Sequence, residues 1–340
     1  MNASDGKQSA LSFSFVFKMG GAFLVLFISW IVSLVFGAAE ASPGEVWLAL
    51  TTDVKGDTVT MIREIRLPRV VAALCVGSAL AVSGAVMQGL TRNPLADPGL
   101  IGLTAGANAA LAVTMALMPA VSVFGTMIAC FIGAAAGGWL VLGIGAVKKG
   151  GLSPFRMVLA GAAVSAFLYA VAQGVGLYFK ISKDVTMWTA GGLVGVSWSQ
   201  VAVIMPFIMA GIGMVLFLSR HLTILRLNRE LAIGLGQRVT WVKSALFLIT
   251  IMLAGASVAL VGNMVFVGLM VPHIVRAVVG TDYRFILPMS AVTGAAFMLL
   301  ADTAGRTVHA PYETPVAAIV ALMGLPFFLF IVRKGGASIQ

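Results

Sequence analysis

The chain has 340 residues, of which 60% are hydrophobic and only 10% are charged, and its formal net charge is +10. Soluble domains are about 45–50% apolar and about 25% charged, so this composition excludes an ordinary soluble protein and indicates a polytopic membrane protein. The basic residues are dispersed among apolar runs without an aromatic-basic stripe, which argues against a nucleic-acid-binding protein.

Apolar segments long enough to cross a bilayer follow one another along almost the whole chain. A span needs roughly 20 apolar residues, and helices are expected because lipid cannot satisfy the backbone of an open sheet. We therefore predict an all-α fold with about ten transmembrane helices in one domain, residues 1–340. The predicted spans are 18–38, 67–90, 97–117, 121–147, 154–178, 198–219, 240–261, 264–280, 285–306 and 314–333.

Lysine and arginine are distributed unevenly between the two sets of connecting segments. When the N-terminus is placed in the cytoplasm, most of the 22 Lys and Arg residues fall in cytoplasmic segments, as the positive-inside rule requires. We therefore predict that both termini are cytoplasmic and that residues 1–17 form a cytoplasmic tail. The segment REIRLPR departs from this rule, because it places Arg63, Arg66 and Arg69 outside.

Small residues inside the spans indicate close helix packing. The segments GLTAG (102–106) and GAAAG (133–137) both have the small-xxx-small spacing that lets helix backbones approach each other. The two cysteines, Cys75 and Cys130, lie within apolar segments. We predict that both are buried as small hydrophobic side chains, without a disulfide or a metal.

The longest polar interruption in the second half is SRHLTILRLNRELAIGLGQRVTWVK, residues 219–243. Within it, LNRELAIGLG is predicted to form a short helix that ends at Gly234 or Gly236. Leu227, Leu231 and Leu235 recur at i, i+4 and i+8, so they form an apolar stripe. Two interpretations remain open at this point: a positive-inside loop, or a docking element for a soluble partner.

Two acidic residues lie near the end of the chain, in LADTAGRTVHAPYETPVAAI (300–319). Asp302 precedes Arg306 by four residues, which is the better order for a helical ion pair. An ionisable residue in a span is also a candidate functional group, and the pattern does not decide between these roles. Glu313 is predicted to cap the next helix at its N-terminus.

Several enzyme and cofactor motifs are missing from the sequence. It contains no G-x-x-x-x-G-K-[ST] loop for a nucleotide phosphate and no H-E-x-x-H zinc motif. The three histidines lie on different predicted elements, so we expect no metal site and no cofactor. We predict a non-enzymatic chain whose transport, if active, takes its energy from another subunit.

Six segments together resemble the FecCD permease family of ABC importers. They span about 60–340 in order, and together they are more specific than any single motif. The segments are RLPRVVAALCVGSALAVSGAVMQGLTRNPLADPGLIGLTAGA (66–107), MWTAGGLVGVSW (187–198), LNRELAIGLGQ (227–237), NMVFVGLMVPHIVRAVVGTDYR (263–284), LPMSAVTGAAFMLLADTAGR (287–306) and ETPVAAIVALMGLPFFLF (313–330).

This resemblance implies a type II ABC importer permease in the bacterial cytoplasmic (inner) membrane. Such a subunit dimerises, with itself or with a second permease subunit, around a central path and works by alternating access. The implied partners are two ATP-binding subunits inside and a substrate-binding protein outside, in addition to membrane lipid. The implied cargo is a ferric siderophore. A haem or cobalamin permease is the alternative within the family, and an ion-coupled secondary transporter is the alternative outside it.

The resemblance also assigns two sets of contact residues. Segment 219–239 becomes a cytoplasmic coupling segment. Its predicted ATPase contacts are Leu227, Asn228, Arg229, Glu230, Leu231, Ala232, Ile233, Gly234, Leu235 and Gly236. The predicted docking residues for the binding protein are Arg66, Arg69 and Arg306, on the outer rim, whereas the role of Arg63 is left open. We expect these arginines to form exposed charge pairs with the partner, so charge reversal at Arg66 or Arg306 should weaken docking and uptake with little effect on folding.

Overall fold

The structure is a computed structural model that describes residues 3–37, 41–146, 154–227 and 229–336. All regular structure in these ranges is helical, which confirms the predicted fold class. The helices are α1 (Ala3–Val35), α2 (Pro43–Thr51), α3 (Asp57–Met61), α4 (Leu67–Thr91), α5 (Leu103–Leu117), α6 (Val123–Ala146), α7 (Pro154–Tyr178), α8 (Ser182–Thr189), α9 (Trp198–Phe217), α10 (Ser219–Leu227), α11 (Arg229–Gly234), α12 (Val239–Val261), α13 (Val267–Val279), α14 (Tyr283–Thr307) and α15 (Val316–Gly336), with a π-helical turn η1 (Ile62–Arg66) and a 3₁₀ turn η2 (Gly99–Ile101).

The predicted spans correspond to two classes of helix. Seven helical segments in the described part of the chain are long and apolar enough to cross a membrane: α1, the continuous α3–η1–α4 segment, α6, α7, α9, α12 and α14. Three shorter apolar helices, α5, α13 and α15, account for the remaining predicted spans. The first helix begins at Ala3, so residues 3–17, predicted as a tail, continue α1.

The predicted span at 97–117 begins later than expected because two polar side chains fold the preceding chain into turns. Asn93 Oδ1 accepts a hydrogen bond from the amide of Leu95 at 3.0 Å, and Asp97 Oδ1 accepts one from the amide of Gly99 at 2.7 Å. Such contacts compete with regular helix formation. Helix α5 therefore begins at Leu103.

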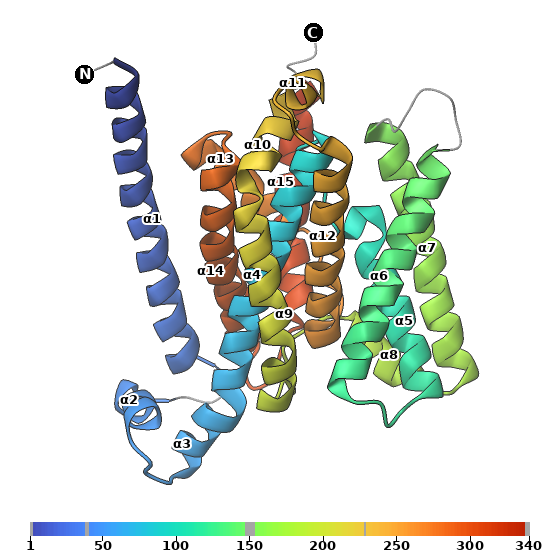
Figure 1. Cartoon of the computed structure of the whole chain (residues 1–340). Helices are drawn as coiled ribbons and strands as arrows, with labels where there is room; N and C mark the ends of the chain where they lie inside the picture. Colours follow the sequence, from blue (N-terminus) through green and yellow to red (C-terminus); the bar gives the residue numbers. More distant parts are fainter. Residues whose placement is uncertain (1–2, 38–40, 147–153, 228, 337–340) are drawn as a thin grey trace.

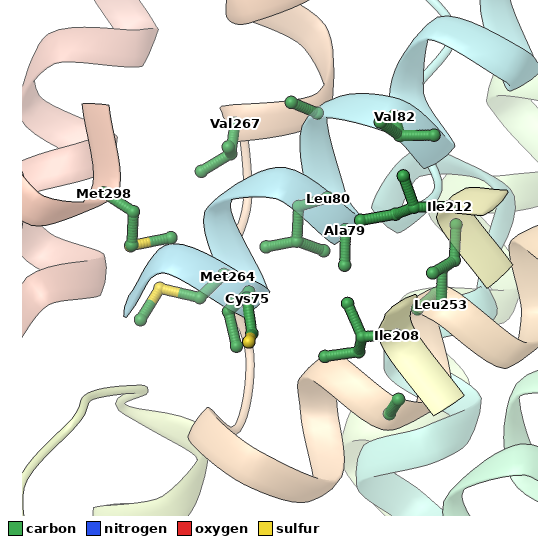
Figure 2. Packing of buried hydrophobic residues seen from close by; sticks show 14 of the residues in the cluster. Cys75, Ala79, Leu80, Val82, Ile208, Ile212, Leu253, Met264, Val267 and Met298 are labelled. Carbon is green, nitrogen blue, oxygen red and sulfur yellow. The ribbon is translucent and has the colours of Figure 1, made fainter. Parts of the chain in front are cut away.

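Helix α4 lies at the centre of the bundle and is buried along most of its length. Apolar side chains of α4, including Ala79, Leu80 and Val82, pack among residues from α9, α12, α13 and α14 (Figure 2). Cys75 belongs to this core, and both cysteines are buried and unpaired, as predicted.

Glycines set the closest helix contacts. A Cβ atom on Gly106 would lie 2.0 Å from the carbonyl oxygen of Gly133, and one on Gly137 would lie 2.2 Å from that of Gly102. The two small-xxx-small motifs therefore pack against each other, across α5 and α6. This confirms the close packing that their spacing predicts.

The two ends of the bundle differ in what they carry. Both termini and α11 lie at one end, called here the α11 end, while α2 and α3 lie at the opposite end, called here the α2 end (Figure 1). Helix α1 stands at the edge of the bundle and packs mainly against α14. Most of the α1 surface is exposed, as expected for a helix that faces lipid on several sides.

Candidate functional site

The arginines of the REIRLPR segment lie at the α2 end, where the α3–η1–α4 segment contains a π-helical turn. This turn, Ile62–Arg66, ends at the second arginine, and α4 continues with Pro68 in its first turn. Such π-helical turns interrupt regular α-helices and occur frequently at functional sites.

Arg66 and Arg306 hold the C-terminal end of α1. The last carbonyl groups of a helix have no partner within the helix and carry partial negative charge. Here the carbonyl oxygens of residues 33–36 accept hydrogen bonds from the two guanidinium groups, at 2.6–3.2 Å. Arg66 donates to the carbonyl oxygens of Leu34 and Val35, and Arg306 donates to those of Ser33 and Phe36. A Cβ atom on Gly37 would lie only 3.0 Å from Nη1 of Arg306 and 3.1 Å from Nη2 of Arg66.

Arg69 belongs to a line of four side chains of alternating charge, Glu313–Arg69–Asp302–Arg306, called here the charge chain. Nη1 of Arg69 lies 2.9 Å from both carboxylate oxygens of Glu313. Its Nε and Nη2 face Asp302 Oδ1, at 2.9 and 2.8 Å. Asp302 Oδ2 in turn lies 3.0 Å from Nε of Arg306. The predicted Asp302–Arg306 pair is therefore present, as part of a longer network.

The two carboxylates of the charge chain are held with different strength. Asp302 is fully buried, so removal of its charge leaves Arg69 and Arg306 with Glu313 as the remaining carboxylate of the charge chain, and loss of one partner of a buried pair destabilises a fold by about 3–5 kcal/mol. The Glu313 side chain is 28% exposed, and pairs that reach solvent contribute only about 0.2–1 kcal/mol. Asp302 is thus the more strongly held partner of Arg69, and Glu313 is the more weakly held one.

These positions correct two expectations. The guanidinium groups were expected to be exposed on a rim, but Arg66, Arg69 and Arg306 are only 4%, 5% and 3% exposed. Charge reversal at these sites should therefore disturb folding, because each group stabilises its own chain. Glu313 was expected to cap the next helix, but its carboxylate pairs with Arg69 instead.

Arg63 has a structural role that its sequence did not reveal. Its guanidinium group donates hydrogen bonds to the carbonyl oxygens of Leu48, Ala49, Thr52 and Val54, at the end of α2 and just after it. It therefore holds the C-terminal end of α2 in the way that Arg66 and Arg306 hold that of α1.

Helix α2 itself was missed, although its sequence carries a start signal. Ser42, Pro43 and Glu45 form a capping box with proline at the first helical turn. The hydrogen bond from the Ser42 backbone amide to Glu45, 2.8 Å long, holds the pKa of Glu45 below its usual value. The exposed Trp47 on this helix is a residue type that favours a membrane interface.

A cavity of about 670 Å³ lies beside the charge chain. It is lined by α8, the loop at 190–196 and the ends of α5, α9 and α12, with Glu313 and Pro315 on one wall. Its lining is mostly apolar, with few polar groups, and its size is that of a site for a small molecule. The sequence did not reveal this cavity, because its walls come from four stretches that lie far apart along the chain.

At the α11 end, the predicted short helix is present. Gly236 has a φ of +76°, its amide donates to Ile233, and the amide of Gln237 donates to Ala232. These two bonds form a Schellman motif around Gly236, which is one of the two predicted end residues, while α11 itself runs to the other, Gly234.

Helix α11 exposes an apolar tip. The exposed fractions of Leu231, Ile233 and Leu235 are 58%, 56% and 68%, while Ala232 is fully buried. Two members of the predicted stripe are therefore on the surface. Asn228 lies outside the described residues, as do the side chains of Leu227, Arg229 and Glu230.

No cluster of three or more His, Cys, Asp or Glu side chains that could hold a metal ion occurs in the described ranges. The site is therefore built from ion pairs, helix-end contacts, an apolar cavity and an exposed apolar tip. This combination, within a bundle of apolar helices, defines a polytopic membrane protein.

Comparison with known proteins defines the class further. The profile of the FecCD transport family matches residues 25–334. The iron(3+)-hydroxamate import system permease protein FhuB of Bacillus subtilis (strain 168) is 42% identical over 89% of this chain and 79% of its own length. The hemin transport system permease protein HmuU of Yersinia pestis is 37% identical over 93% of this chain and 95% of its own.

A solved structure agrees with these sequences. The structure described as an inward-facing conformation of a putative metal-chelate type ABC transporter matches with a TM-score of 0.78 and 26% identity, over 92% of this chain and 98% of that one. The chain belongs to the FecCD transport family. It is a permease of an iron-chelate type ABC importer.

Proposed function

We propose that this chain carries a ferric siderophore across the bacterial cytoplasmic membrane, by alternating access, as one of two permease subunits. Two ATP-binding subunits act on the α11 end, which is cytoplasmic together with both termini, and a substrate-binding protein docks at the outer, α2 end. The main support for this proposal is the exposed apolar tip of α11. An exposed apolar surface on an isolated folded chain marks a site that a partner covers in the complex. The surrounding basic residues of 219–243 support the cytoplasmic side.

The cargo is inferred from the relatives and from the cavity. The relative with 42% identity is named for ferric hydroxamate import, and a cavity of about 670 Å³ at the outer end can admit an organic chelate. Haem is the second candidate, because the relative with 37% identity is named for hemin transport.

An ion-driven transporter is disfavoured by the position of Asp302. That residue was the main candidate for an intramembrane ion site, yet its two oxygens face the guanidinium groups of Arg69 and Arg306. A carboxylate held by two buried positive charges does not attract a further cation.

Docking of the binding protein is assigned to Arg66, Arg69 and Arg306. Acidic side chains of the partner would pair with these guanidinium groups after displacing some of their present contacts. Electrostatic attraction of this kind weakens with salt, so complex formation should weaken as ionic strength rises.

Uptake by reconstituted vesicles tests the proposal. The complete transporter is supplied with a ferric trihydroxamate chelate or with haem, and the ATP-binding subunits are either active or unable to hydrolyse ATP. We expect concentrative chelate uptake only with active subunits. Uptake that persists with inactive subunits and follows a proton or sodium gradient would overturn the ABC mechanism, and uptake of haem alone would replace the cargo.

A further inference from the structure

The outer cavity and the charge chain share one residue. Glu313 lines the cavity together with Met115, Met187, Trp188, Gln200 and Pro315. The same carboxylate places both oxygens 2.9 Å from Nη1 of Arg69. One side chain is therefore part of the cavity wall and part of the proposed docking site.

The geometry of Arg69 makes the Glu313 contact the replaceable one. Nε and Nη2 of Arg69 are held by Asp302, which is fully buried, so they are out of reach of a partner protein. Only Nη1 points to a carboxylate that solvent reaches, because the Glu313 side chain is 28% exposed. An incoming carboxylate can therefore exchange with Glu313 while the pair with Asp302 stays in place.

The chain next to Glu313 is anchored on one side. The amide of Thr314 donates to the carbonyl oxygen of Gly305 at 2.9 Å, and Val316 begins α15 and is buried. Release of Glu313 from Arg69 would thus free the Glu313 side chain, while Thr314 and α15 stay attached to the bundle.

We propose that Glu313 is a positioning residue that couples docking of the binding protein to opening of the outer cavity. In the undocked permease, Glu313 pairs with Arg69, and its side chain is held as part of the cavity wall. A carboxylate of the docked partner takes its place on Arg69, and the released Glu313 side chain turns away and widens the cavity that receives the chelate. This inference rests on the proposed docking role of Arg69 and adds a consequence to it.

Cysteine labelling of the cavity tests the coupling without a partner. Val196 lines the cavity and is 7% exposed, and the two native cysteines are buried, so Val196→Cys offers a site with low background. The full-length permease is labelled in nanodiscs with a membrane-impermeant maleimide. We expect Glu313→Gln to raise the labelling rate by about two- to fivefold, the population change that loss of one solvent-reached ion pair produces.

Two further variants separate coupling from general loosening. Glu64→Gln is the matched control, because Glu64 is an exposed acid in the same REIRLPR segment, and its labelling rate should equal that of Val196→Cys alone. Glu313→Asp keeps the charge and should return the rate toward that of the parent. An unchanged rate in Glu313→Gln, or an equal rise in Glu64→Gln, would overturn the proposal.

Addition of the binding protein of the same transporter completes the test. Docking should accelerate labelling in the parent and add nothing in Glu313→Gln, because the side chain at position 313 is already free of Arg69. Additive increases would overturn the coupling. Binding of the partner to Arg69→Gln is measured separately. If Arg69→Gln binds the partner as well as the parent does, Arg69 has no docking role and the coupling has no basis. If binding is weakened but the labelling increases are additive, the docking role stands and the coupling alone is wrong.

Discussion

The α2 end and the α11 end of the bundle present their predicted contact residues in opposite ways. At the α2 end, Arg66, Arg69 and Arg306 are almost completely buried and bind groups of their own chain. At the α11 end, Leu231 and Leu235 are exposed. One end is thus occupied by internal partners, while the other has an open surface.

This difference separates two kinds of contact surface. An exposed apolar tip can bind a partner without rearrangement, so affinity depends on the area that becomes buried. Buried arginines can bind a partner only if they give up contacts within their own chain. Binding therefore changes the conformation of the segments that those contacts held. Under the proposed function, the α2 end therefore responds to docking by exchanging partners, and the α11 end transmits force through a fixed contact.

The largest effect on folding is expected at Asp302. Asp302→Asn keeps the shape of the side chain but leaves Arg69 and Arg306 with excess positive charge, which should lower the free energy of unfolding by about 3–5 kcal/mol. Thermal unfolding in detergent measures the change, with Asp53→Asn, at an exposed acid, as the control. Equal melting of the two variants would show that the charge chain does not stabilise the outer end.

A smaller effect is expected where α1 is held. Arg66→Gln and Arg306→Gln leave carbonyl groups of residues 33–36 without their donors, and each lost buried contact is worth about 1–3 kcal/mol. Arg306→Gln also breaks the ion pair with Asp302, so Arg66→Gln is the variant that reports the α1 contacts alone. Amide hydrogen exchange should accelerate in the last turn of α1. In Arg63→Gln the acceleration should move to the end of α2, because Arg63 binds carbonyl groups there. Identical exchange patterns in the three variants would contradict these separate roles.

Sequence patterns predicted the features of this fold that depend on local spacing. The apolar runs indicated the spans, GLTAG and GAAAG indicated close packing, and Gly236 was one of two candidate ends for the short helix. The partners of the arginines could not be predicted from sequence patterns, because Arg69 and Glu313 are 244 residues apart and Arg306 binds α1 across 273 residues. Side-chain charge indicates that a partner exists, but only the packed fold shows which group it is.

The next effect concerns how α11 ends. Gly236 has a φ of +76°, and a side chain in the left-handed region costs about 1–2 kcal/mol, so Gly236→Ala should loosen the tip by that amount. Gly234→Ala is the control, because Gly234 has open space around it and no positive φ, and alanine favours a helix. Hydrogen exchange of 231–237 measures both. Equal exchange in the two variants would show that the Schellman motif does not fix the tip.

The smallest effect on folding, with the largest effect on coupling, is expected at the tip itself. Leu231→Ser and Leu235→Ser alter exposed side chains, so the free energy of unfolding should stay within about 0.5 kcal/mol of the parent. Transport-linked ATP hydrolysis should nevertheless fall, because the apolar contact that transmits the movement is lost. Val278→Ser, at an exposed apolar residue near the end of α13, should leave hydrolysis unchanged. Normal hydrolysis in the two leucine variants would remove α11 from the coupling contact. A large loss of stability would instead show that the tip supports its own fold, so that the two ends of the bundle would no longer differ in kind.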